Sequence, residues 1–214
     1  MARVRYGKTW WGNAWVSALE RIDCDTNRLP RGRSYANANR VSHLEITPRG
    51  NIKARVKGTR SKPYNVEIGL GKFDDPQKQL IQKLIRANPL LASELSMGKL
   101  PESMLELLSK KGINLLPHSW EDIAAYCSCP DWANPCKHLA AVYYMLANEI
   151  DKDPYILFAL RRMSKDELLE GAGFAPEQES AQLPENELER LAAGFVSYQE
   201  FNEGSSCLKE SSEA

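Results

Sequence analysis

The sequence lacks long apolar runs and has few cysteines, and both facts limit the classes of protein to which it can belong. No apolar stretch in the 214 residues approaches the roughly 18 residues that a membrane-spanning helix needs. The first five residues lack the apolar run of a secretory signal. Three of the five cysteines fall within ten positions, which does not resemble a disulfide framework. We therefore expect a cytoplasmic protein, in reducing surroundings and without membrane contact.

The sequence also lacks the common catalytic motifs. It contains no H-E-x-x-H, no G-x-x-x-x-G-K-[ST] phosphate loop, no G-x-S-x-G and no H-x-E with P-C-x-x-C. The redox pair C-x-x-C is missing as well. We expect no catalytic residues, and an enzyme with an unrecognised site is the least favoured of three interpretations.

The formal net charge is zero, but the charges are unevenly distributed. Residues 1–70 hold 14 Lys and Arg against 5 Asp and Glu, residues 71–164 hold 11 of each, and residues 165–214 hold 3 against 12. The basic first part suggests an anionic partner such as a nucleic acid. An ordinary solvated sheet face with charges that protect its edges is the alternative. The candidate nucleic-acid residues are Arg31, Arg33, Lys53, Arg55, Lys57, Arg60 and Lys62.

Hydrophobic periodicity predicts an α+β fold. Apolar residues from Trp10 to Ile22 recur with helical spacing, and Thr9 is placed to cap this helix. Apolar and polar residues then alternate in three runs with turn residues between them, which predicts a three-stranded antiparallel meander over 44–68. One face of this meander is apolar, and we expect the Trp10 helix to cover it.

Helical spacing returns after Gly71 and predicts several short helices before residue 111. A short strand or extended piece at 123–126 and a longer helix at 135–149 follow, and two short helices come after them. The chain divides into four predicted parts: 1–72, basic, with the first helix and the sheet; 73–120, a helical connector; 121–170, a zinc knuckle and the helices after it; and 171–214, an acidic and partly disordered tail with a candidate helix at 184–201.

The most specific signal is C-x-C-x6-C-x-H, at Cys127, Cys129, Cys136 and His138. Thiolate and imidazole are the ligands that zinc prefers. Residues two apart on an extended segment share a face, whereas residues two apart on a helix are about 200° apart. Cys136 should therefore lie at or before the first helical residue. The helix N-terminus and Lys137 should lower the pKa of the cysteines. Buried or redox-active cysteines beside an incidental histidine are the alternative.

This spacing resembles the SWIM-type zinc finger, whose pattern is C-x-C, a variable loop and C-x-H. The resemblance to stand-alone bacterial members extends to four further runs: Thr9-Trp10-Trp11-Gly12, Gly32-Arg33-Ser34-Tyr35, Cys129-Pro130-Asp131-Trp132 and the run from Pro135 to Tyr144. It covers most of residues 9–160 and implies zinc bound by the four Cys and His residues. It also implies DNA or protein binding beside helicase-like ATPases of the SWI/SNF type.

We expect the zinc to be structural, because three cysteines and one histidine fill a tetrahedral shell, whereas catalytic zinc keeps a position open. His118, nine positions before Cys127, is then expected on the surface. The expected function is a zinc-binding module for DNA and/or protein interaction, working with a helicase-like ATPase. The alternative is a protein-interaction adaptor that does not bind nucleic acid and uses the acidic tail for recognition.

Overall fold

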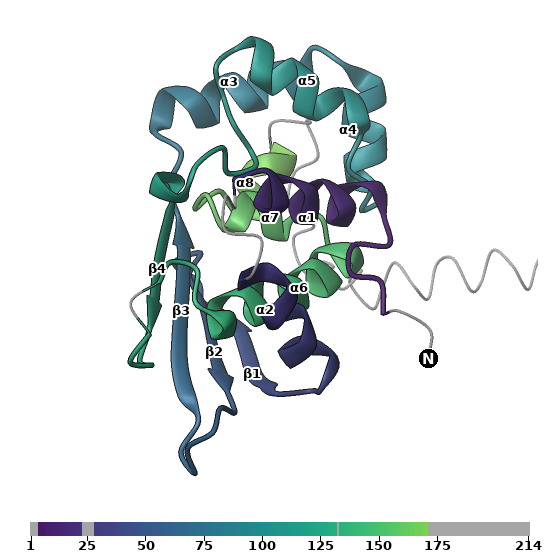
Figure 1. Cartoon of the computed structure of the whole chain (residues 1–214). Coiled ribbons are helices and arrows are strands. Elements are labelled where there is room, and N and C mark those ends of the chain that lie inside the picture. The colour runs from purple at the N-terminus through teal and green to yellow at the C-terminus, as the bar shows by residue number, and fades with distance from the viewer. Residues whose placement is uncertain (1–3, 23–27, 132, 171–214) are drawn as a thin grey trace, which may run out of the picture. The chain divides into compact units, whose positions relative to one another are not determined.

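The computed structural model describes residues 4–22, 28–131 and 133–170, and it confirms the predicted α+β class. Helices pack with a four-stranded antiparallel sheet (Figure 1). In chain order the elements are α1 (Trp10–Ile22), α2 (Arg28–Asn37), β1 (Val41–Ile46), β2 (Ile52–Val56), β3 (Tyr64–Leu70), α3 (Asp75–Arg86), α4 (Pro89–Ser96), α5 (Glu102–Lys110), the 3-10 turn η1 (Trp120–Asp122), β4 (Ile123–Cys127), α6 (Lys137–Lys152), α7 (Ile156–Ala159) and α8 (Lys165–Glu170).

The sheet has the order β1-β2-β3-β4, and its first three strands are the predicted meander. The sequence indicated that 123–126 is extended, and the structure pairs this segment with the meander as a fourth strand. Leu70 lies opposite Ile123, and Val66 lies opposite Cys127. This pairing attaches the cysteine-rich segment directly to the sheet.

The helix that lies against the sheet is α6, which contacts all four strands. The alternation along β2 confirms which face is buried, since Ile52 and Val56 are fully buried while Lys53 is exposed. The Trp10 helix was expected to cover the sheet, but this helix, α1, packs against α6. Two indole N–H groups make this contact specific: Trp11 donates to the carbonyl of Ile150 (2.9 Å), and Trp15 donates to that of Tyr143 (3.2 Å).

Helix α2 was not predicted, and it packs extensively against α6 (Figure 1). The approach is close because Gly32 faces α6, where a Cβ would lie 2.2 Å from the Cβ of Ala140. Leu29 and Ala36 are buried on the same helix. The glycine in the Gly32–Tyr35 run therefore has a packing role, since a side chain there would separate the two helices.

The segment before α1 is attached to the C-terminal end of α6 through Asp151. The carboxylate of Asp151 accepts hydrogen bonds from the backbone N–H of Lys8 (2.7 Å) and from the hydroxyl of Thr9 (2.6 Å). The Thr9 oxygen also accepts from the backbone N–H of Gly12 at 3.1 Å, which confirms the predicted cap.

The short helices α3, α4 and α5 lie in the connection between β3 and β4, as the periodicity predicted. The two ends of this connection meet, because the backbone N–H of Gly71 donates to the carbonyl of Asp122 at 3.3 Å. Buried Arg161 joins the connection to the rest of the core. Its guanidinium donates to the carbonyls of Gly71 (3.0 Å), Leu115 (3.3 Å) and Leu116 (3.3 Å).

In the part of the chain that the structure describes, no helix has the length and apolar character needed to cross a bilayer. The predicted tail at 171–214, with its candidate helix, lies outside the described residues. The division of the chain into four parts stays a prediction.

Candidate metal centre

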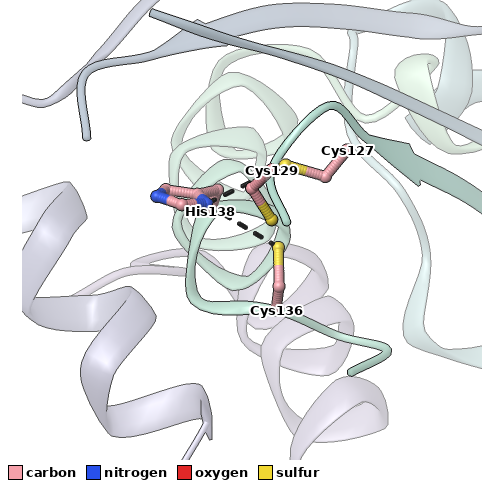
Figure 2. Close-up of side chains that lie close together, drawn as sticks. All are labelled: Cys127, Cys129, Cys136 and His138. Atoms are coloured by element: carbon pink, nitrogen blue, oxygen red, sulfur yellow. Dashed lines mark hydrogen bonds between the residues drawn. The ribbon is translucent and has the colours of Figure 1, made fainter. Parts of the chain in front are cut away.

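The four Cys and His side chains of the cysteine-rich segment converge between the end of β4 and the start of α6. Cys127 is the last residue of β4, and Cys136 is the N-cap of α6, where its sulfur accepts from the backbone N–H of Leu139 (3.5 Å). His138 follows in the first turn. The expected position of Cys136, at the boundary of the helix, is confirmed. Figure 2 shows the four side chains pointing toward one another.

The distances fit a tetrahedral zinc shell. One donor atom from each of Cys127, Cys129, Cys136 and His138 lies within 4.8 Å of every other. The Nδ1 atom of His138 is 3.9 Å from the Sγ atoms of both Cys127 and Cys136. Bonds of about 2.3 Å to sulfur and about 2.0 Å to nitrogen give a tetrahedron with edges of about 3.5–3.8 Å. The soft donors and these spacings are consistent with zinc binding.

The thiols of this cluster compete for negative charge. The pKa of Cys136 is lowered to about 4, mainly because Cys127 donates a hydrogen bond to its sulfur, with further bonds from His138 and the amide of Leu139. The same contact and burial raise the pKa of Cys127, and burial raises that of Cys129. The prediction that the helix end lowers the pKa of all the cysteines is therefore wrong for these two. A coordinated divalent cation favours the thiolate at every ligand and removes the competition.

Two tyrosine rings flank the imidazole of His138. The ring centroid of Tyr64 lies 4.5 Å from that of His138, and the centroid of Tyr35 lies 5.4 Å away in an edge-on arrangement. The Nε2 atom of His138 is buried and has no hydrogen-bond partner among the described residues. Packing between the rings thus orients the imidazole with Nδ1 toward the sulfurs. Gly58 leaves space for this stack, since a Cβ there would lie 2.3 Å from the Tyr64 ring.

Neighbouring elements also hold the loop that joins β4 to α6. Asp131 forms an ion pair with Arg28 of α2 at 2.8 Å. Ser128 exchanges two hydrogen bonds with Asn65 of β3, through its backbone N–H (3.0 Å) and its hydroxyl (2.9 Å). The loop is therefore connected to α2 on one side and to the sheet on the other.

The structure separates the predicted nucleic-acid residues into different settings. Lys53 and Arg55 lie on the outer face of the sheet, where Lys53 has acidic cross-strand neighbours and Arg55 lies opposite Ser42 and Asn65. Lys53 forms an exposed ion pair with Glu67 at 3.7 Å and lies opposite Glu45 on β1. The guanidinium of Arg33 lies instead over the ring of Tyr144, with its carbon 5.2 Å from the ring centroid.

The other predicted residues, Arg31, Lys57, Arg60 and Lys62, are exposed on α2 or in the connection between β2 and β3. Arg60 lies over the Tyr64 ring, 5.7 Å from its centroid. Arg40 and Lys137 were not among the predicted nucleic-acid residues, yet both lie over the Tyr35 ring, 4.7 and 5.4 Å from its centroid. One signal was available: the segments 28–44, 57–66 and 133–148 contain no Asp or Glu. The expected surface position of His118 is confirmed.

Residues 119–147, which contain all four predicted ligands, match the family model of the SWIM zinc finger. The chain is also 36% identical over 167 residues to "Uncharacterized protein Rv2102" from Mycobacterium tuberculosis (strain ATCC 25618 / H37Rv). That alignment covers 78% of this chain and spans 60% of the relative's length. No solved structure matches the chain.

Proposed function

We propose that Cys127, Cys129, Cys136 and His138 coordinate one structural zinc ion, and that the module built around it binds macromolecules. The convergence of four donor atoms within 4.8 Å, inside the segment that matches the SWIM zinc finger, is the observation that carries this proposal. The role is binding and not catalysis, because four protein ligands complete a tetrahedral shell and leave no position for a reacting water.

The first proposed partner is DNA, together with a helicase-like ATPase of the SWI/SNF type that the resemblance implies. The excess of Lys and Arg in residues 1–70 supports an anionic partner. The reducing cytoplasm is the proposed location, because the three thiols must stay reduced to bind metal.

A protein-interaction adaptor is the second candidate, and two exposed apolar residues favour it, one in α4 and one at its C-cap. Leu90 is 68% exposed and Met97 is 60% exposed. They are two helical turns apart and therefore share one side of the helix. Both candidate functions include the zinc site, and they differ only in the partner that is bound.

Metal analysis combined with two binding assays tests the proposal. We expect about one zinc per chain in protein purified without chelator, and a clear loss of zinc in Cys129→Ser. His118→Ala is the matched control because this exposed histidine lies outside the cluster, and it should keep its zinc. DNA binding at low salt supports the first candidate. Co-purification with a SWI/SNF-type ATPase without DNA binding supports the adaptor, and zinc far below one equivalent in the unmodified protein refutes both.

A further inference from the structure

The outer face of the sheet is a poor site for a polyanion, although it carries Lys53 and Arg55. In one row across the strands, Lys53 lies between Glu45 of β1 and Glu67 of β3. A phosphate that approaches Lys53 therefore meets two carboxylates as well. The outer face around Lys53 is therefore a weaker candidate than the segments of the first 70 residues that contain no Asp or Glu.

Three chain segments supply side chains that pack around His138 or belong to the metal centre, and they carry six cations that we name the cationic rim. The members of the rim are Arg31, Arg40, Lys57, Arg60, Lys62 and Lys137. Among the residues that the structure describes, none of the six forms an ion pair. The segments 28–44, 57–66 and 133–148, which supply the rim, contain no Asp or Glu. Asp131, in the neighbouring loop, is already paired with Arg28.

Three members of the rim lie over the same tyrosines that hold the imidazole of His138. Arg40 and Lys137 lie over the ring of Tyr35, and Arg60 lies over the ring of Tyr64. Each of these two rings also packs against the imidazole of His138. The backbone also joins the parts of the rim, since the N–H of Lys57 donates to the carbonyl of Arg40 at 2.8 Å.

A conformational link follows from this arrangement. When His138 is fixed by coordination, Tyr35 and Tyr64 have a fixed surface to pack on, and the cations above them keep their spacing. When coordination is lost, only ring packing holds the imidazole, and the tyrosines lose the part of their support that the metal supplies. The cations then lose the pre-organisation that lowers the entropic cost of binding a charged ligand.

We infer that the cationic rim binds the phosphodiester backbone of a nucleic acid, and that this binding is coupled to metal occupancy through Tyr35 and Tyr64. Six cations spread over three chain segments match an extended polyanion better than a single phosphate group. The inference rests on the proposed function, and it names the surface and the ligand. Because coupling between two sites is reciprocal, bound nucleic acid must also increase the affinity of the site for the metal.

The test compares two double variants by fluorescence anisotropy with a labelled DNA duplex of about 20 base pairs in about 50–200 mM salt. Arg60→Gln with Lys137→Gln removes two rim cations, and Lys53→Gln with Arg55→Gln removes two cations from the outer sheet face. We expect the rim variant to bind more weakly and its slope of log affinity against log salt to shrink by about 2, since each phosphate contact contributes about 0.9. The sheet-face control should keep the affinity and slope of the unmodified protein.

Two metal-dependent readouts complete the test. Chelator-treated protein should bind the duplex as weakly as the rim variant does. Saturating duplex should raise the concentration of a chromogenic chelator that removes half of the zinc at equilibrium. Lys57→Gln with Lys62→Gln offers a second rim variant, because both side chains are exposed and its folding can be checked by circular dichroism.

The outcomes distinguish failure of this inference from failure of the proposed function. If the duplex binds but only the sheet-face variant loses affinity, or if binding is the same with and without zinc, the inference is overturned and DNA binding stands. If no duplex binds at about 50 mM salt, the inference and the DNA arm of the proposed function both fail. The adaptor function then remains, and the measurement of bound zinc tests it.

Discussion

Varying the concentration of free zinc should change the stability of the fold by a calculable amount. The donors come from β4, the loop and α6, and they converge only in the folded chain. For one ion bound to the folded state alone, the free energy of unfolding rises by about 1.4 kcal/mol for each tenfold rise in free zinc above the dissociation constant. For a chain of this size that corresponds to about 3–6 °C in Tm per decade.

The assay is thermal unfolding by circular dichroism in buffers that fix free zinc over several decades. Cys129→Ser should lower or abolish the dependence of Tm on zinc, whereas His118→Ala should keep it. Because the cysteine set must supply thiolates, the dependence should begin at higher zinc concentrations as the pH falls. A flat Tm in the unmodified protein, or an unchanged slope in Cys129→Ser, would refute the assignment of this cluster as a metal centre.

Three further predictions concern the frame that holds the site. Gly32→Ala should destabilise the fold by about 1–3 kcal/mol because the new methyl overlaps α6, while Gly71→Ala, which meets only an ordinary contact at 3.5 Å, should cost less in the same urea titration. Arg161→Met should cost about 3–5 kcal/mol because it leaves three carbonyls without their charged donor, and the exposed Arg86→Met should leave the urea midpoint nearly unchanged. The amides of His118 and Ser119 lower the pKa of Asp122, so its stabilising effect is present at neutral pH and is lost as the pH falls through its folded pKa. The difference in unfolding free energy between the unmodified protein and Asp122→Asn should therefore shrink in acid, and a difference that grows would contradict this account.

The elements that the sequence predicted well are those whose pattern is local. The alternation of Ile52, Ala54 and Val56 with charged residues indicates a half-buried strand, whichever element covers it. The spacing of the cysteines likewise placed Cys136 at a helix boundary, because geometry within a few residues decides that position. The metal centre is the part of the fold with the most local determinants, and it was the easiest to predict.

The elements that were missed depend on contacts between distant segments. Helix α2 contains Pro30 and Gly32, which weaken a helical pattern, and its stability comes from packing on α6. The pairing of β4 with β3 joins residues such as Leu70 and Ile123, more than 50 positions apart, and periodicity carries no information on such a pairing. The contact of Tyr35 with His138 has the same character, and it brings the neighbouring Arg40 close to the imidazole only after folding.

The hydrogen bond between Gly71 and Asp122 has a consequence for how this architecture tolerates change in chain length. Strands β3 and β4 are antiparallel neighbours, and helices α3, α4 and α5 lie in the connection between them. The two ends of this connection are joined by the hydrogen bond between Gly71 and Asp122. Insertions or exchanges within the connection leave the register of the two strands untouched. A single residue added inside β4, by contrast, would turn the first sulfur ligand to the opposite face of the sheet. The connection before β4 can therefore vary in length, whereas β4 itself cannot.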